Sequence, residues 1–271
     1  MNTLRYLQQT LPSFAFDLIK LSLGLLLLSV VFLPLEKLFA LHPQKAFRKG
    51  FVADLAYYFI SSLVPRLLIV PMSMIALVAN HVYPITLHLW MASLPPAVRL
   101  AAALIVAEIG FYWGHRCAHQ LPWLWRFHAV HHSAEEMDWL INTRAHPIDL
   151  LFIRCCGYVP LYLLGLVQPA GNRVDLIPIL VALIGSMWGY FIHANVRWRF
   201  GFLEYVIATP AFHHWHHAND GPQYVNKNYA ALLPWVDRLF GSFYLPKSDR
   251  PKQYGINEVL PNSLVKQLIR P

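Results

Sequence analysis

The sequence HRCAHQLPWLWRFHAVHH spans residues 115–132 and, together with HHWHH at residues 213–217, decides how the whole chain is interpreted. On a helix, residues three or four apart lie on one face, so histidines with this spacing can direct two or three imidazoles to one point. Neutral imidazole is a ligand of zinc, copper, iron and nickel. The three clusters hold eight histidines: His115 and His119; His128, His131 and His132; His213, His216 and His217. Because eight exceeds the four ligands of a structural zinc site, the sequence predicts two metal ions.

The histidines are unevenly distributed along the chain. Eleven of the fourteen lie between His115 and His217. A single HxxxH pair is weak evidence, because such a pair is about as often packed or on the surface as bound to metal. Three clusters of related spacing within about a hundred residues favour a shared metal centre. Four other histidines are expected to pack or to support the ligands: His42, His81, His88 and His214.

The composition is that of a membrane protein. Hydrophobic residues make up 56% of the 271 residues and charged residues 13%, whereas about a quarter of the residues are charged in a typical soluble domain. Five apolar stretches approach the length of a membrane span: residues 14–33, 51–79, 98–113, 148–167 and 176–192. The sequence therefore predicts an all-α integral membrane protein with four or five transmembrane helices.

Two features of these stretches affect the topology at the amino terminus. Pro65-Arg66 interrupts the second stretch and leaves open a hairpin at that point. The first stretch lacks the basic tip, short apolar core and small-residue cleavage site of a secretion signal, so we expect it to be an anchor.

The excess of basic residues indicates an orientation in the membrane. The formal net charge is +8, and in a membrane protein such an excess is better explained by the positive-inside rule than by nucleic-acid binding. Lys45, Arg48 and Lys49 lie in the loop at residues 41–50, whereas residues 80–96 contain no Lys or Arg. Eight further cations lie beside the histidine clusters, which predicts that this face is cytoplasmic: Arg116, Arg126, Arg144, Arg197, Arg199, Lys227, Arg238 and Lys247.

The order of the apolar stretches allows the clusters to meet. The third stretch runs directly into His115, and the last two form a hairpin that returns His193 to the face that His146 left. All three clusters then emerge on one side, which predicts a helical bundle with a cytoplasmic helical cap that holds a histidine-rich dimetal site. The three cysteines, Cys117, Cys155 and Cys156, suggest no disulfide framework.

Residues that flank the clusters extend the motifs. The motifs are HRxxH at residues 115–119, LWxxHxxHHS at residues 124–133, His146-Pro147, His193-x-Asn195 and TPxxHxxHH at residues 209–217. Over residues 98–245 their order and spacing resemble the fatty acid hydroxylase and sterol desaturase superfamily of integral-membrane non-haem di-iron oxygenases.

The resemblance implies a ligand set and a division of the chain. It implies two iron ions in a catalytic domain at residues 98–245, between membrane anchor helices at residues 1–97 and a loosely ordered basic tail at residues 246–271. Zinc could replace iron at such a nitrogen-rich site in a crystal. The ten implied ligands, five for each iron, are His115, His119, His128, His131, His132, His146, His193, His213, His216 and His217. Nearby acids that could orient the rings are Glu135, Glu136, Asp138, Asp149, Glu204 and Asp220.

Glu108 and Asn195 are candidates for a catalytic role. Glu108 places a carboxylate in an apolar stretch, which is costly in a membrane and usually means that it faces a cavity or a partner. It lies seven residues before His115 on the same helical face, so it could orient a ligand or line the substrate route. A structural hydrogen bond to another helix is equally consistent with the sequence. Asn195 lies two residues after His193, a predicted ligand.

The resemblance implies an oxygen-dependent oxidation at a C–H bond of a lipid, sterol-like or fatty-acyl substrate. Hydroxylation is favoured over desaturation, because Met137-Asp138-Trp139 and Asn142-Thr143-Arg144 resemble the bacterial and alkylglycerol monooxygenase branches. The expected location is the bacterial inner membrane.

The electrons for this reaction are expected from a separate protein, such as a b-type cytochrome or a ferredoxin. The sequence has no dinucleotide-binding fingerprint, no iron–sulfur cysteine pattern and no haem attachment motif. A basic surface could attract an acidic donor, although the same cations could only set the topology and bind anionic headgroups. The cations concerned are Arg126, Arg197, Arg199 and Arg238.

A membrane zinc hydrolase and a metal transporter are the alternative functions. A hydrolase of the HExxH type needs a glutamate as its general base, but Arg116 stands at that position. A transporter would place its ligands near the middle of the membrane on broken helices. The clusters here lie mostly in polar, arginine-rich stretches beyond the ends of the predicted spans.

Overall fold

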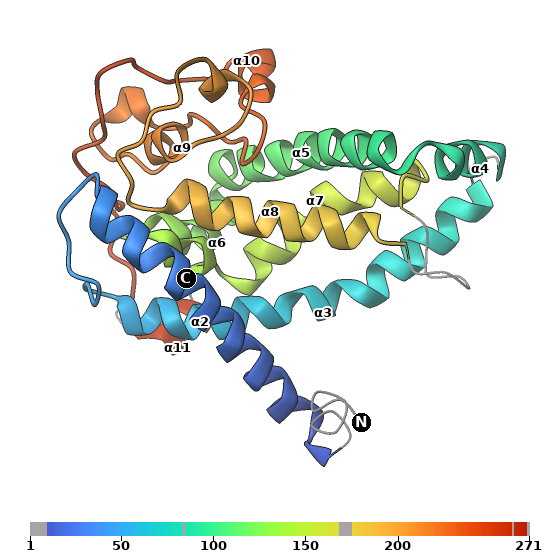
Figure 1. Cartoon of the computed structure of the whole chain (residues 1–271), viewed down its shortest axis with the longest axis horizontal. Coiled ribbons are helices and arrows are strands. Elements are labelled where there is room, and N and C mark those ends of the chain that lie inside the picture. The colour runs from blue at the N-terminus through green and yellow to red at the C-terminus, as the bar shows by residue number, and fades with distance from the viewer. Residues whose placement is uncertain (1–9, 83–84, 168–174, 262, 270–271) are drawn as a thin grey trace.

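The computed structural model describes residues 10–82, 85–167, 175–261 and 263–269 (Figure 1). Within these ranges every regular element is a helix, and two isolated β-bridges join Ala40 to Val196 and Ala218 to Tyr254. The longer helices are α2 (Ser13–Phe39), α3 (Phe51–Val82), α4 (Ile85–Ser93), α5 (Pro96–Gln120), α6 (Pro122–His132), α7 (Pro147–Leu163) and α8 (Ile177–His193). The shorter ones are η1 (Trp139–Thr143), η2 (Gly201–Tyr205), α9 (Pro210–His216), η3 (Pro222–Tyr224), α10 (Trp235–Phe240) and α11 (Leu264–Ile269).

Each of the five predicted apolar stretches forms a helix. Three helices are long and apolar enough to cross a membrane, namely α2, α3 over residues 51–75, and α5, while α8 is apolar but shorter. α3 continues through Pro65-Arg66, so the hairpin that the sequence left open does not form. α5 runs to Gln120, beyond the predicted end at residue 113, and therefore carries both histidines of the first cluster.

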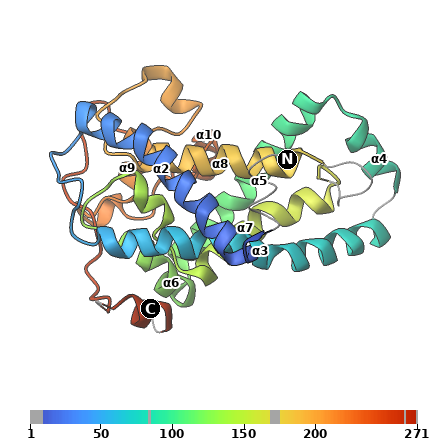
Figure 2. The same ribbon diagram turned by 60° about the horizontal axis from the view of Figure 1, so that its bottom comes forward.

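Four helices form the body of the molecule. α3, α5, α7 and α8 run alongside one another, with α4 at one end and α6, α9 and α10 gathered at the other (Figure 1 and Figure 2). α5 ends, α7 begins and α8 ends at that second end, so the histidine-bearing segments meet there. α2 crosses the body obliquely and exposes most of its leucines and valines, as a lipid-facing helix does.

Proline begins the helices that carry the converging histidines, and also α7. It occupies the first or second position of α5, α6, α7, α8 and α9, where its missing N–H is not needed and its fixed φ favours the helix. α9 has in addition an N-cap, because Thr209 Oγ1 accepts a hydrogen bond from Phe212 N at 3.4 Å. These defined starts set the helical register of the histidines that follow.

α5 and α7 pack closely because both place glycine at their contact. A Cβ atom on Gly110 would lie 2.2 Å from the backbone oxygen of Cys156, and one on Gly157 would lie 2.2 Å from Cε1 of Phe111. Gly114, one turn after Gly110, also has little room, since its Cβ would lie 2.9 Å from Cβ of Cys156. Small residues spaced in this way allow membrane helices to approach. The contact fixes α7 against the helix that carries the first histidine cluster.

A buried ionic network joins the N-terminal helices to the histidine-bearing end. Arg48 donates to both carboxylate oxygens of Asp138 at 2.7 and 2.8 Å and forms an ion pair with Asp54 at 2.8 Å. Arg144 also donates to Asp54. All four side chains are buried, so each charge is compensated by a partner rather than by water. The loop before α3 therefore holds the segment around η1 in place.

The C-terminal segment packs against the body. Tyr57 Oη on α3 donates to Gln267 Oε1 at 2.9 Å, and His42 Nε2 lies 3.1 Å from the backbone oxygen of Pro251. The bridge between Ala218 and Tyr254 adds a third connection. Pro251, Tyr254 and Gln267 therefore contact the body of the molecule, within the segment that the sequence suggested to be a loosely ordered tail.

Gly110→Ala is expected to lower the thermal stability of the protein. The new Cβ would meet a backbone carbonyl that cannot move aside unless α5 and α7 separate. Such overpacking costs about 1–3 kcal/mol, more than the ~1 kcal/mol by which Ala exceeds Gly as a helix former.

Gly185→Ala in α8 is the matched control, because a Cβ at Gly185 meets nothing within 4 Å. Its melting temperature should be unchanged or slightly raised. Thermal melts of both variants in one detergent measure the difference, and equal melting temperatures for Gly110→Ala and the unaltered protein would contradict the close contact.

Candidate metal centre

Nine imidazoles from four helices converge at the end of the bundle where α5 stops. Their ring nitrogens form two groups, and within each group the candidate ligand atoms all lie within 4.8 Å of one another. The first group contains His115 and His119 of α5, His128 and His132 of α6, and His216 of α9. The second group contains His131 of α6, His193 of α8, His213 of α9, and His217 directly after α9.

Each HxxHH motif contributes to both groups. The i and i+4 members of the α6 motif, His128 and His132, belong to the first group, whereas the i+3 member, His131, belongs to the second. In α9 the i+3 member, His216, belongs to the first group. Residues i and i+4 lie on one side of the helix and residue i+3 is turned away from i+4, so one motif reaches two centres. From the sequence alone, the histidines of each cluster were expected to point to a single metal site.

Hydrogen bonds fix the tautomers of three rings in the first group. Nδ1 of His115 donates to Tyr229 O at 2.7 Å, Nδ1 of His216 donates to Lys227 O at 2.8 Å, and Nδ1 of His128 donates to Asp149 Oδ2 at 3.0 Å. Carbonyl and carboxylate oxygens can only accept, so Nδ1 carries the proton in each ring. The Nε2 atom of a neutral ring then presents a lone pair.

These lone pairs have no partner among the described residues. Nε2 of His115 lies 3.1 Å from Nε2 of His128, although neither atom has a proton to donate to the other. Nε2 of His119, His132 and His216 are buried and make no hydrogen bond in the described part of the chain. Buried polar atoms are normally satisfied. A cation at the centre of the group would satisfy all five.

The second group is built in the same way. Nδ1 of His131 donates to Arg144 O at 2.9 Å, and Nδ1 of His193 donates to Gly189 O at 2.7 Å. The Nε2 atoms of these two rings then face each other at 3.3 Å, and Nε2 of His213 lies 3.0 Å from Nε2 of His193. Nε2 of His217 is buried without a hydrogen bond to any described residue.

Burial favours the neutral form of several of these rings. Burial, reinforced by the neighbouring imidazoles, holds the pKa of His131, His132, His213 and His217 well below its usual value. Burial likewise holds the pKa of His216 well below its usual value. A neutral ring keeps the lone pair that a metal ligand requires.

The spacing of the nitrogens fits bound metal ions. Two histidine ligands about 2.1 Å from one ion lie roughly 3.0–3.4 Å apart at ordinary coordination angles. The separations of 3.1, 3.3 and 3.0 Å between facing Nε2 atoms agree with this range. The residues present therefore fit a pair of metal ions with all-nitrogen protein ligands.

His146 is the one predicted ligand that the structure does not bring to the centre. It is the N-cap of α7, where Nδ1 accepts a hydrogen bond from Ile148 N at 3.1 Å, and its Nε2 lies 3.1 Å from Leu268 O. Both ring nitrogens are therefore engaged elsewhere. The His-Pro pair starts a helix here, because proline at the first position favours a capping residue before it.

Asn195 has a structural position rather than one at the centre. Its side chain donates to His42 O at 2.7 Å and accepts from His42 N at 2.9 Å. These two hydrogen bonds join the end of α8 to the loop that follows α2. Asn195 is buried and does not line the cavity beside the histidines.

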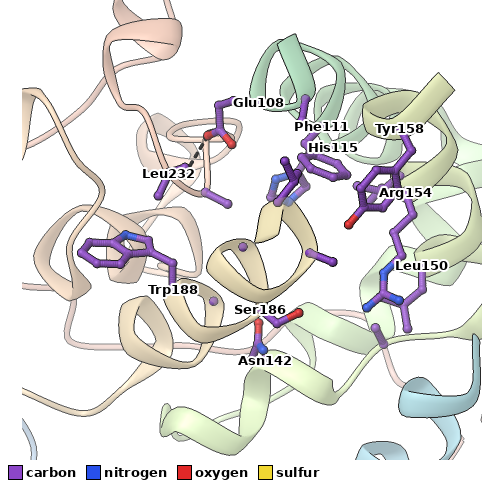
Figure 3. Close-up of a pocket in the computed structure, with 18 of the residues that line it drawn as sticks. Glu108, Phe111, His115, Asn142, Leu150, Arg154, Tyr158, Ser186, Trp188 and Leu232 are labelled. Carbon is purple, nitrogen blue, oxygen red and sulfur yellow. Dashed lines mark hydrogen bonds between the residues drawn. The ribbon is translucent and has the colours of Figure 1, made fainter. Parts of the chain in front are cut away.

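Glu108 contacts the backbone of a segment beside the centre. Its Oε1 accepts hydrogen bonds from Leu232 N at 2.7 Å and Leu233 N at 3.1 Å (Figure 3). These bonds hold the segment whose Tyr229 carbonyl orients His115. Glu108 also lines the cavity, so it combines structural hydrogen bonds with a place in the cavity wall.

The groups that orient the rings were mostly invisible in the sequence. Asp149 was one of six acids that could not be ranked, and its place in the first turn of α7 is what brings it to His128. Four of the other partners are backbone carbonyls, which carry no sequence signal. His214, expected not to bind metal, lies outside both groups, with Nε2 3.1 Å from Ala194 O.

A cavity of about 840 Å³ opens beside the two groups. His115, His131 and His213 form part of its wall, and most of the remaining wall is apolar. Phe111 of α5 and Leu150 of α7 lie on one side of it, with Trp188 of α8 and Leu232 on another (Figure 3). The arrangement can therefore hold a hydrocarbon chain next to the metal site.

Residues 100–242 match the family model for fatty acid hydroxylases. The chain is 36% identical over 201 residues to an ornithine lipid hydroxylase of Rhizobium tropici, and the aligned residues cover 73% of this chain and 57% of that protein. It is 34% identical over 148 residues to an alkylglycerol monooxygenase of Danio rerio, with 55% of this chain and 31% of that protein covered. A Delta(7)-sterol 5(6)-desaturase of Gibberella zeae is 26% identical over 159 residues, with 55% and 43% covered.

The chain thus spans 57% of the length of the first of these relatives and less than half of the other two. No solved structure gives a significant match. The family match covers more than half of the 271 residues and contains all nine converging histidines. The chain therefore belongs to the fatty acid hydroxylase family.

Proposed function

We propose that the protein is a membrane-bound, non-haem di-iron oxygenase that hydroxylates a C–H bond of a lipid. The observation that supports this most is the pair of adjacent imidazole groups, with their lone pairs directed inward, at the wall of an apolar cavity. The family match and the names of the relatives point the same way, since two of the three are a hydroxylase and a monooxygenase. Desaturation is the other outcome open to this chemistry, as in the sterol desaturase.

The proposed ligand set is the nine histidines of the two groups, without His146. Bound iron would supply the redox chemistry that activates dioxygen. Hydroxylation inserts one oxygen atom into the C–H bond, and the other leaves as water after two electrons and two protons have been added. The sequence has no dinucleotide-binding, iron–sulfur or haem attachment motif, so the electrons are proposed to come from a separate donor.

The surrounding residues are proposed to keep the centre ready for an ion. Asp149 and the carbonyls of Tyr229, Lys227 and Arg144 hold ring protons on Nδ1, so that the Nε2 atoms face inward. Such partners also make the ring a stronger ligand. The rings thus need little rearrangement when metal binds.

The cavity is proposed to position the substrate and to exclude water. Leu104, Phe111, Val181 and Leu232 give it an apolar wall, which suits an alkyl chain. The polar end of the wall is formed by His115, His131 and His213. A chain that lies along the cavity would present a C–H bond to the metal site.

The metal centre is proposed to face the cytoplasm of a bacterial cell, at the inner membrane. The positive-inside rule supports this orientation. Arg126, Arg197 and Arg238 are exposed at the end of the molecule that carries the histidines. This basic surface is proposed to attract an acidic electron donor, such as a ferredoxin or a b-type cytochrome.

His216→Ala is expected to lower the iron content and to abolish lipid oxidation, because it removes a ligand from the first group. His146→Ala is the matched control, since His146 lies outside both groups, and it should keep nearly all of its iron. It should lose about 0.5–2 kcal/mol of stability as a missing N-cap. Elemental analysis of purified protein and product formation with dioxygen and a donor measure the two effects.

Full iron content and activity in His216→Ala would contradict the ligand set. If the unaltered protein bound one zinc ion and cleaved a bond without oxygen, the zinc hydrolase would replace the oxygenase. A low iron content in His146→Ala would instead indicate that His146 binds metal.

Asp149→Ala should weaken iron binding roughly 10–100-fold, because the proton position of the His128 ring would no longer be fixed. Asp149→Asn keeps an oxygen that can accept the same proton and should be affected less. Competition for iron against a calibrated chelator gives the affinities. An equal loss in both variants would show that the charge, rather than the hydrogen bond, is what matters.

Charge reversal by Arg126→Glu together with Arg238→Glu should slow turnover about tenfold when a bacterial ferredoxin and its reductase supply electrons at low salt. The difference should shrink at high salt, because screening weakens the attraction. Turnover with a small chemical reductant should not change. If the donor-supported rate is unaltered at low salt, the basic surface serves only to orient the protein in the membrane and to contact lipid headgroups.

A further inference from the structure

Arg154 of α7 is a cation inside the cavity without an acidic partner. Its side chain lines the cavity and makes no hydrogen bond or ion pair with any residue that the structure describes. Other arginines in the body behave differently. Arg48 and Arg144 pair with Asp54, and Arg99 pairs with Asp175 at 2.6 Å.

The three carboxylates in the cavity wall have partners other than Arg154, although Oδ1 of Asp149 makes no hydrogen bond with any described residue. Asp149 accepts from His128, Glu108 accepts from the backbone of Leu232, and Asp175 is paired with Arg99. None of them forms an ion pair with Arg154. A guanidinium without an anion is costly in an apolar surrounding. Such a position is expected only if something else supplies the anion.

Three more polar side chains share this part of the cavity. Tyr158 lies one turn after Arg154 on α7, Ser186 belongs to α8 and Asn142 belongs to η1. All three line the cavity, and within the described ranges none of their side chains makes a hydrogen bond. Figure 3 shows Arg154 and Tyr158 extending from α7, with Ser186 and Asn142 across from them. The four side chains leave donors that a polar ligand could satisfy.

We propose that Arg154 binds an oxyanion of the lipid substrate, a carboxylate or a phosphate, and that this contact determines which lipids the cavity accepts. The guanidinium offers a planar fork of donors that matches both anions. The apolar remainder of the wall suits an alkyl chain. The ligand class is therefore an anion-bearing amphiphile, and its oxidation rests on the function proposed above.

The position of Arg154 also bears on which carbon reacts. Asp149 touches His128 at the metal end, and Arg154 follows five residues later, about 7.5 Å along the helix axis. Helical side chains lean towards the N-terminus of their helix, which for α7 is the metal end. An anion held by Arg154 would therefore keep the anion-bearing end of the lipid, rather than the far end of a long chain, near the centre.

The test is a binding measurement that does not depend on turnover. Hexadecanoate, hexadecyl phosphate, hexadecanol and hexadecyltrimethylammonium share one chain and differ in their head. Isothermal titration of each into metal-loaded protein in a neutral detergent gives the affinities without a donor or a reaction. The unaltered protein should bind at least one of the two anions roughly tenfold or more tightly than the alcohol.

Arg154→Gln should remove this preference, and Arg154→Lys should keep part of it, because Lys retains the charge without the planar fork. Lys252→Gln is the charge-matched control, since Lys252 is exposed and does not line the cavity. Iron content equal to that of the unaltered protein shows that each variant is folded and that its metal site is intact. The anion that benefits more from Arg154 identifies the head as carboxylate or phosphate.

Two results would overturn the proposal. One is equal affinity of the unaltered protein for the anions and the alcohol. The other is an anion preference that survives Arg154→Gln with full iron content, which would place the anion elsewhere, for example on the metals. Neither result bears on oxygenase activity, and a protein that binds anions through Arg154 but oxidises no lipid would refute only the proposed function.

Discussion

The centre depends on where the ring protons are held. Backbone carbonyls and one carboxylate accept from the Nδ1 atoms of His115, His128 and His216, and carbonyls do the same for His131 and His193. Each of these hydrogen bonds orients its ring so that the Nε2 lone pair points into the centre. The lone pairs of neighbouring rings therefore face one another in a buried space. Other parts of the fold keep these acceptors in place. Glu108 holds the segment that contains Tyr229 through a hydrogen bond from Leu232 N. The ion pairs among Arg48, Asp54 and Arg144 hold the backbone carbonyl of Arg144.

The sequence predicted what depends on local spacing and composition. The apolar stretches became helices, and histidines with helical spacing became neighbours on one face, because both properties follow from the residues themselves. The sequence could not assign His131 and His216 to their groups, since that depends on how α6 and α9 are rotated against each other. The structure places His146 at a helix cap and Asn195 in a bridge between loops, positions that a single sequence does not distinguish from those of a ligand or a catalyst.

The chain also shows why a membrane enzyme site draws on segments outside its motifs. Arg48 and Asp54 lie before the residues that match the family model. Their ion pairs nevertheless hold Arg144, whose backbone carbonyl orients His131. Gly110, Gly114 and Gly157 allow α7, which carries Asp149, to pack closely against α5. Contacts of this kind depend on shape, and a single sequence does not reveal them.

The division of each HxxHH motif between two groups means that the two centres share their helices. The α6 motif carries His128 and His132 for the first group and His131 for the second, and the α9 motif is divided in the same way. A displacement of either helix would therefore move ligands of both groups together, so that damage to one centre is expected to reach the other.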